Sequence, residues 1–235
     1  MEVPPTCLFN KANNQAQSLT DRFINPFCRL VPSFVLPLHL TVLAFACGMI
    51  ACWNVYNRNS IHALFFWALN RFLDGLDGAV ARRRGITSEL GGFLDMLGDF
   101  LVYSSIPISC GMAVAALGNL KQPFTYMAPS NSPWLSIAVL EATFHINNFV
   151  LLYGAAVMER QKRTSKTPSR ESTEIAARPA LVESLESGVI FTLMLAWPRR
   201  IEALSWAMAL LVAVGTFQRA QWLLWALWDH ESKGI

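Results

Sequence analysis

Four aspartates stand at helical spacing in two neighbouring, mostly apolar stretches of the chain. Asp74 and Asp77 are three positions apart and Asp95 and Asp99 are four apart, so each pair lies on one face of a helix. Because the turn between the stretches is short, we expect antiparallel helices whose four carboxylates converge at one depth. Oxygen-rich sites suit Mg²⁺ or Mn²⁺ and commonly keep positions for water and substrate phosphates. The spacing therefore predicts a divalent-cation site.

Small and cationic residues accompany the carboxylates. The small residues recur at helical spacing and are Gly75, Gly78, Ala81 and Gly98. They would let a bulky ligand approach the backbone, or they would serve only close helix packing. Arg82 would offer a planar fork to a phosphate. An ion pair with Arg71 or Arg82 would neutralise one aspartate, but two arginines can neutralise only two of the four carboxylates.

The composition indicates that these helices belong to a membrane protein. Hydrophobic residues make up 53% of the 235 residues and charged residues only 15%, whereas soluble domains carry about a quarter. The mean hydropathy of +0.34 agrees. The 15 Phe and 8 Trp exclude a solvated disordered chain. A net charge of +3 is too small to imply nucleic acid, and five cysteines without metal-ligand spacing indicate reduced thiols.

Six apolar runs predict six transmembrane helices, because about 20 apolar residues span a bilayer. The runs cover residues 34–53, 61–73, 93–120, 134–157, 185–197 and 203–228. Residues 18–32 mix apolar and charged side chains, which predicts an amphipathic helix on the membrane surface. We therefore expect an all-α polytopic membrane protein. Its parts are an N-terminal segment over 1–33, a six-helix domain over 34–229 and a tail over 230–235.

Basic residues are distributed unevenly between the two sides of this predicted topology. The side that holds both termini carries thirteen: Lys11, Arg22, Arg29, Arg82, Arg83, Arg84, Arg160, Lys162, Arg163, Lys166, Arg170, Arg178 and Lys233. The other side carries four: Arg58, Lys121, Arg199 and Arg200. Arg71 and Arg219 fall within helices and are not counted. The positive-inside rule therefore places both termini, and the aspartates with them, on the cytoplasmic side.

The complete motif connects these residues to a family. The pattern Asp-x2-Asp-Gly-x2-Ala-Arg-x8-Gly-x3-Asp-x3-Asp runs from Asp74 to Asp99. It resembles, without a departure, the motif of the CDP-alcohol phosphotransferases, also called CDP-alcohol phosphatidyltransferases. The resemblance implies a phospholipid-synthesising membrane enzyme in which a hydroxyl attacks a CDP-alcohol and releases CMP. CDP-diacylglycerol is the expected donor, because a chain this short resembles the users of that lipid.

The resemblance also implies roles for individual residues. Asp74, Asp77 and Asp95 would hold two Mg²⁺ or Mn²⁺ ions, with Asp99 contributing and serving as the catalytic base. Asp74, Gly78, Ala81 and Arg82 would bind the CDP group. Two divalent ions on a diphosphate stabilise the leaving CMP, while a carboxylate accepts the proton of the hydroxyl. The resemblance further implies a homodimer, and small residues offered for its packing are Ser104, Ser105, Gly111 and Ala113.

The acceptor alcohol stays open at the level of sequence. Arg219 interrupts an apolar helix and would pair with Glu183, Glu186 or a substrate phosphate, or reach the membrane surface instead. These three residues are the candidates for acceptor binding. The family often has Pro-Asn-x-x-Thr before its first span, where this chain has Pro-Leu-His-Leu-Thr over 37–41, so His39 receives no role. The polar residues of the fourth predicted span are expected to hydrogen-bond inside the bundle and are Glu141, His145, Asn147 and Asn148.

Two other classes of protein compete with the enzyme hypothesis. A divalent-cation transporter would use the same carboxylates as an ion path, but it leaves the Gly-Ala-Arg register between them without a purpose. A purely structural membrane protein would explain none of the motif. Release of CMP from a CDP-alcohol, compared with metal flux without nucleotide, separates enzyme from transporter.

Overall fold

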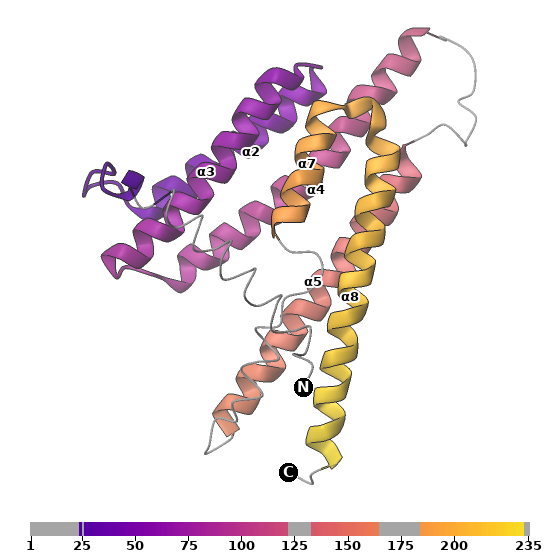
Figure 1. The fold of residues 1–235 in the computed structure, drawn as a ribbon. Coiled ribbons are helices and arrows are strands. Elements are labelled where there is room, and N and C mark those ends of the chain that lie inside the picture. Colours follow the sequence, from indigo (N-terminus) through magenta and orange to yellow (C-terminus); the bar gives the residue numbers. More distant parts are fainter. Residues whose placement is uncertain (1–23, 25, 122–132, 165–183, 233–235) are drawn as a thin grey trace, which may run out of the picture.

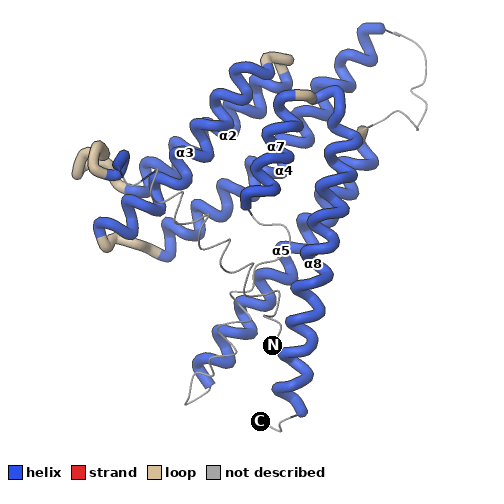
Figure 2. Tube along the Cα trace, viewed as in Figure 1, coloured by secondary structure: helices blue, strands red, loops and turns tan. Residues whose placement is uncertain are grey.

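The computed structural model describes residues 24, 26–121, 133–164 and 184–232, and all regular structure in these residues is helical (Figure 2). The elements, in chain order, are α2 (Pro37–Tyr56), α3 (Ser60–Arg84), α4 (Glu89–Lys121), α5 (Trp134–Thr164), α7 (Ser184–Ala196), the short 3-10 helix η2 (Pro198–Arg200) and α8 (Ile201–Ser232). The expected all-α fold is therefore confirmed for the described part of the chain.

Local sequence signals explain where the helices around the aspartates begin and end. Pro37 occupies the first turn of α2, where its missing N–H costs no helical hydrogen bond. At the start of α3, the Asn59 side chain accepts a hydrogen bond from the backbone N–H of His62. At its end, Gly85 adopts a left-handed conformation with φ 66°. The chain can therefore reverse within a few residues and enter α4 at Glu89.

The helices form two groups that α4 connects (Figure 1). α2 and α3 are an antiparallel pair, and α2 also packs against α4. α5 and α8 form a second pair whose members run in the same direction, with α7 beside α4. A large buried core joins the two groups and includes Val55, Trp67, Ile106, Phe191 and Met208. Packing on both sides of α4 therefore fixes the position of the helix that carries Asp95 and Asp99.

Two glycines allow α4 to approach its neighbours closely. A Cβ on Gly48 of α2 would lie 2.6 Å from a methyl group of Val102 on α4. A Cβ on Gly111 of α4 would lie 2.5 Å from Ile137 on α5. We expected Gly111 to serve packing between two copies of the chain. The structure shows instead that α5 of the same chain packs against it. Ala113, from the same expected set, is buried as well, at 3% exposure.

The surface of the helices is apolar, as a bilayer requires. Four helical stretches of the described chain are long and apolar enough to cross a membrane: Pro37–Tyr56, Glu89–Ala116, Trp134–Val157 and Pro198–Trp225. Large exposed side chains along them include Trp53, Phe149, Leu210 and Trp225. A membrane protein is thus confirmed, whereas the count of six spans is not. α3 carries too many charges to qualify, and α7 is short.

Part of the predicted amphipathic segment lies outside the described residues. Of its described residues, Ile24 and Cys28 are buried in a cluster with Leu73 and Leu76 of α3, while Phe27 is 45% exposed. Arg84, at the end of α3, donates hydrogen bonds to the backbone carbonyls of residues 31, 32 and 35. The chain before α2 is therefore attached to α3 close to its aspartates.

Candidate active site

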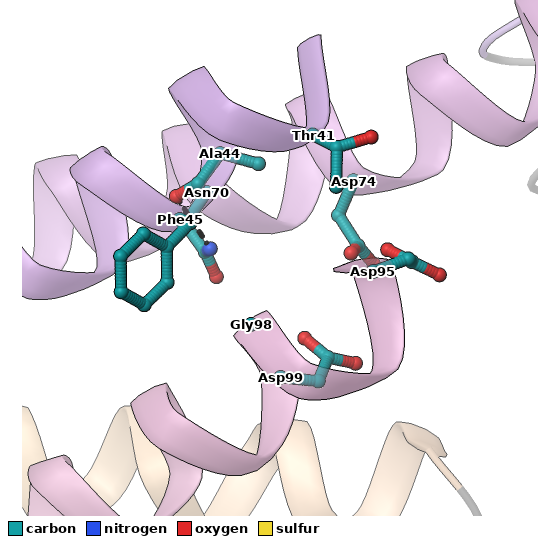
Figure 3. A pocket seen from close by; sticks show the side chains of 8 residues that line it. All are labelled: Thr41, Ala44, Phe45, Asn70, Asp74, Asp95, Gly98 and Asp99. Carbon is teal, nitrogen blue, oxygen red and sulfur yellow. Dashed lines mark hydrogen bonds between the residues drawn. The ribbon is translucent and has the colours of Figure 1, made fainter. Parts of the chain in front are cut away.

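Three of the four aspartates line one pocket between α2, α3 and α4 (Figure 3). Asp74 comes from α3, and Asp95 and Asp99 come from successive turns of α4. The other lining residues are Thr41, Ala44, Phe45, Asn70 and Gly98. The pocket encloses about 190 Å³ of space, including the part open to solvent. The predicted convergence of the two pairs is therefore observed for three members.

Asp74 and Asp95 meet across the pocket from the two helices (Figure 3). Their carboxyl groups point toward each other (Figure 3). Two carboxylates that face each other repel unless a proton or a cation compensates their charge. Neither side chain is fully buried. The pair therefore presents oxygen atoms to a pocket in which a positive charge is favourable.

Arg71 supplies one positive charge to this cluster. Its Nη2 donates a hydrogen bond to Oδ1 of Asp99 at 2.7 Å, and its Nη1 lies 3.6 Å from Oδ2 of Asp74. Nη1 also lies 2.6 Å from the hydroxyl oxygen of Tyr103, and that hydroxyl donates to Oδ2 of Asp99 at 3.0 Å. The ion pair with Arg71, which the sequence offered as the alternative to cation binding for one aspartate, is thus present and involves two aspartates.

The guanidinium group of Arg71 is fixed by further contacts. Its Nε donates to the side-chain oxygen of Asn70 at 2.8 Å, and Asn70 in turn donates to the backbone carbonyl of Ala44 on α2 at 2.8 Å. Its Cζ lies 4.8 Å from the ring centre of Trp67 and 5.1 Å from that of Tyr103, which is cation–π distance. Arg71 therefore connects all three helices around the pocket.

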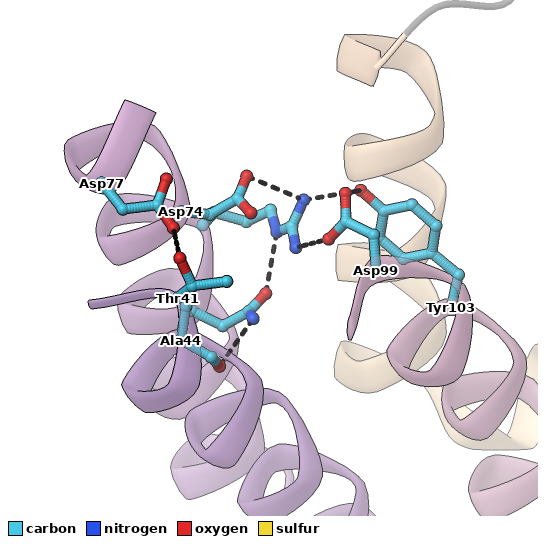
Figure 4. Close-up of polar contacts among 8 residues, drawn as sticks. Thr41, Ala44, Asp74, Asp77, Asp99 and Tyr103 are labelled. Atoms are coloured by element: carbon cyan, nitrogen blue, oxygen red, sulfur yellow. Dashed lines mark hydrogen bonds and ion pairs between the residues drawn. The ribbon is translucent and has the colours of Figure 1, made fainter. Parts of the chain in front are cut away.

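Asp77 differs from the other three aspartates in its surroundings. It is 5% exposed and does not line the pocket. The Thr41 hydroxyl of α2 lies 2.5 Å from its Oδ2 and 3.2 Å from the backbone carbonyl of Pro37 (Figure 4). Thr41 therefore sets the orientation of Asp77 at the edge of the site.

The donor set has the right chemistry for Mg²⁺ or Mn²⁺, although its geometry as it stands does not hold an ion. Within the described part of the chain, no three His, Cys, Asp or Glu side chains are grouped closely enough for that. The donors are carboxylate oxygens, which these hard ions prefer. The close approach of Asp74 and Asp95 is the feature that a divalent cation would stabilise.

The residues expected to bind CDP lie beside the pocket rather than in its lining. Gly78 and Ala81 follow Asp77 on α3, and a Cβ on Gly78 would lie 3.1 Å from Nη1 of Arg82. The guanidinium of Arg82 therefore lies over the glycine, on an exposed part of α3. Of the CDP set, only Asp74 reaches the pocket itself.

The candidates for acceptor binding are only partly described. Nη1 of Arg219 on α8 donates to the side-chain oxygen of Asn147 on α5 at 2.8 Å, and Thr216 shares the same acceptor at 3.1 Å. This confirms the expected hydrogen-bonding role of Asn147 inside the bundle. Glu183 lies outside the described residues, and so does the side chain of Glu186. Arg219 is not among the residues that line the pocket.

Sequence reasoning missed two partners of the aspartates and one partner of Arg71. Thr41 contacts Asp77, Tyr103 contacts Asp99, and Asn70 contacts Arg71. A polar Asn70 within an apolar run was a signal for an interior role. Tyr103 follows Asp99 by four positions and so shares its helical face. Neither signal identifies which residue of a neighbouring helix is contacted.

Helices with an apolar surface that bring acidic side chains together around a pocket define an integral membrane protein with an oxygen-rich site. A sequence model described as "CDP-alcohol phosphatidyltransferase" matches residues 34–225. The chain belongs to this family. Its members use a CDP-alcohol and an alcohol acceptor in membranes, and they generally depend on divalent cations.

Individual relatives match about a third to a half of the chain. "Inner membrane protein YnjF" of Escherichia coli K12 is 38% identical over 48% of this chain and 56% of its own length. "Archaetidylinositol phosphate synthase" of Pyrococcus horikoshii is 40% identical over 35% of this chain and 43% of its own. "CDP-diacylglycerol–serine O-phosphatidyltransferase" of Bacillus subtilis 168 is 30% identical over 34% and 45%. The chain thus spans about half the length of these relatives. No solved structure matches it significantly.

Proposed function

We propose that this chain transfers the substituted phosphate group of a CDP-alcohol to the hydroxyl of an acceptor alcohol and releases CMP. The observation that carries the proposal is the meeting of Asp74 and Asp95 in one pocket with Asp99. The three aspartates come from two helices, α3 and α4, and all three are positions of the family motif. CDP-diacylglycerol is the donor that we propose.

The pocket would receive the diphosphate end of the donor rather than the whole molecule. The three carboxylates in its lining would meet the phosphates through the cations that they hold. Gly78, Ala81 and Arg82 lie next to it on α3, where the nucleotide would extend. The lipid chains would remain at the apolar surface of the helices.

The carboxylates would then divide the chemical work. Asp74, Asp77 and Asp95 would hold divalent cations, which stabilise negative charge on the diphosphate and on the departing CMP. Asp99 would accept the proton of the attacking hydroxyl. The new bond joins the acceptor oxygen to the phosphorus of the substituted phosphate, and the bond from that phosphorus to the CMP oxygen breaks. Arg219, Glu183 and Glu186 are our candidates for contact with the acceptor.

A direct assay tests the proposal. The purified chain would be given CDP-diacylglycerol, Mg²⁺ and a panel of alcohols, with CMP release measured and the lipid product identified by mass. We expect CMP release that requires one of the alcohols and stops when a chelator removes the metal. Asp74→Asn should abolish it, whereas Glu89→Gln, an exposed acidic residue at the start of α4, should not. Metal flux without CMP release would support the transporter instead.

The placement of the site and the assembly are parts of the same proposal. The distribution of basic residues supports a cytoplasmic site with both termini on that side. A homodimer also stays a prediction, and its packing surface must differ from the one formed by Gly111 and Ala113. A mass measurement in mild detergent that gives only monomer across concentrations would contradict it.

A further inference from the structure

We propose that Thr192 on α7 is a positioning residue for the reaction. It fixes the indole ring of Trp67 on α3. That ring in turn fixes the guanidinium group of Arg71, which contacts both Asp74 and Asp99. No described residue of α7 lines the pocket, so the helix acts on the site through these side chains. The inference rests on the proposed function, because it assigns α7 a role in the same reaction.

A hydrogen bond between α3 and α7 carries the first step. The indole N–H of Trp67 donates to the hydroxyl oxygen of Thr192 at 2.9 Å. That hydroxyl donates its own proton to the backbone carbonyl of Gly188 at 2.7 Å, which leaves the oxygen as the acceptor for the indole. Trp67 is 3% exposed, and a buried N–H without an acceptor is unfavourable. The ring is therefore held in an orientation that keeps this hydrogen bond.

The contact between the Trp67 ring and Arg71 carries the second step. The Cζ atom of Arg71 lies 4.8 Å from the centre of that ring, which is cation–π distance. The nitrogen atoms of the same planar group bond the side chains of Asn70, Tyr103 and Asp99. A ring that turned toward another acceptor would leave the guanidinium free to tilt. The direction of the hydrogen bond from Arg71 to Asp99 therefore depends on where the ring lies.

The neighbouring residue of α7 contacts the second aromatic ring at Arg71. Phe191 is fully buried, and its ring stacks on that of Tyr103 with 4.9 Å between the ring centres. The Tyr103 hydroxyl donates to Asp99 at 3.0 Å (Figure 4). Phe191 also meets the Trp67 ring edge to face, with 5.9 Å between centres. Two adjacent residues of α7 thus contact both of the rings that lie at cation–π distance from Arg71.

Thr192 is the residue through which this link can be tested without disturbing the core. Its side chain is exposed, whereas Trp67 and Phe191 are buried. Thr192→Val keeps the shape of the side chain but removes the hydroxyl, and Thr192→Ser keeps the hydroxyl. Thr143 on α5 provides a matched control, because its hydroxyl donates to the backbone carbonyl of Leu140 in its own helix at 2.7 Å.

The measurement is CMP release from CDP-diacylglycerol in Mg²⁺, with an acceptor alcohol that supports turnover by the wild type. We expect Thr192→Val to lower kcat on the order of tenfold, because misplacing a positioned group by about 1 Å can cost up to about a hundredfold. The KM for the donor should change little. The residues proposed for the nucleotide begin at Gly78, about 16 Å along α3 from Trp67 at about 1.5 Å per residue.

A double-mutant cycle tests whether Thr192 acts through Trp67. Trp67→Phe also removes the hydrogen bond, so the double variant Trp67→Phe/Thr192→Val should have nearly the kcat of Trp67→Phe alone. Thr192→Ser and Thr143→Val should keep wild-type kcat. Thermal unfolding in detergent checks that each variant is folded. If Trp67→Phe does not fold, the comparison of Thr192→Val with Thr192→Ser still decides.

Three results would overturn the inference and leave the proposed function intact. The first is wild-type kcat in folded Thr192→Val, and the second is an equal loss of kcat in Thr143→Val. The third is a pair of losses that multiply in the double variant, which would show that Thr192 does not act through Trp67. Absence of CMP release by the wild-type chain would instead refute the proposed function, and the inference with it.

Discussion

Asp74 and Asp99 lie in the same pocket but have different neighbours. Asp74 meets Asp95, whereas both oxygens of Asp99 accept hydrogen bonds from Arg71 and Tyr103. One carboxylate thus faces another acidic group, and the other faces hydrogen-bond donors. This difference makes the two Asp→Asn substitutions informative as a pair.

Asp99→Asn should keep metal and donor binding but lose the chemical step. General-base help contributes about a hundredfold to ten-thousandfold, so turnover should fall by that order. Asp74→Asn should weaken metal and CDP-alcohol binding together, because it removes a charged ligand. Calorimetric binding of the CDP-alcohol in Mg²⁺, alongside turnover, measures both effects. Equal loss of binding in the two variants would make Asp99 primarily a metal ligand.

Thr41 offers a residue-scale test of how Asp77 is oriented. Thr41→Val keeps the shape of the side chain but removes the hydroxyl that lies 2.5 Å from Asp77. We expect the Mg²⁺ concentration needed for half-maximal activity to rise about tenfold to a hundredfold, as for other orienting partners of metal ligands. Thr41→Ser, which keeps the hydroxyl, should behave like wild type. The same Mg²⁺ dependence in both variants would show that Asp77 needs no such partner.

At the scale of elements, the distance between α2 and α4 determines whether the aspartates can meet. Gly48 lies at this crossing, and its missing side chain makes room for Val102. Val102 is fully buried and lies on α4 three residues beyond Asp99. The fit of these two residues therefore sets where α4 lies against the other two helices.

Gly48→Ala should push α4 away from α2. Its Cβ would lie 2.6 Å from Val102 and 3.2 Å from the side-chain nitrogen of Asn70, so we expect a loss of about 1–3 kcal/mol in stability together with reduced turnover. Gly92→Ala on α4 meets no atom within 4 Å and should leave stability unchanged or raised by up to about 1 kcal/mol. Thermal unfolding in detergent measures the stability of both variants. Equal stability would contradict a tight crossing at Gly48.

At the scale of the whole molecule, successive helices reverse direction along the path from α2 to α8 (Figure 1). Such a path brings the ends of α3, α5 and α8 to one side, where the basic residues concentrate. The predicted orientation in the membrane and the direction of the helices are therefore consistent with each other.

Reporter fusions test this orientation directly. A reporter whose fluorescence or enzymatic activity depends on its compartment would be joined after Lys121, after Thr164 or after Ile235. We expect the last two on the cytoplasmic side and the first on the opposite side, because α4 ends at Lys121 while α5 ends at Thr164. The same side for the fusions at Lys121 and Ile235 would contradict the topology.

The sequence by itself determined the fold class and the acidic motif. Long apolar stretches can satisfy their backbone only as helices in a membrane, and Asp74, Asp77, Asp95 and Asp99 follow helical spacing. Both inferences depend on local periodicity, which is visible in one chain. Family membership followed from the same motif and was confirmed by comparison.

Only the tertiary structure decided which partner each aspartate has. The contacts of Thr41 with Asp77 and of Arg71 with Asp99 join residues 36 and 28 positions apart, respectively. Such pairs depend on how deeply one helix packs into the next, which Gly48 and Gly111 determine through volume rather than local pattern. Because Gly111 packs against α5 of its own chain, it does not provide the contact that we expected between two copies of the chain. Helical periodicity specifies the face of a residue, but packing specifies its neighbour.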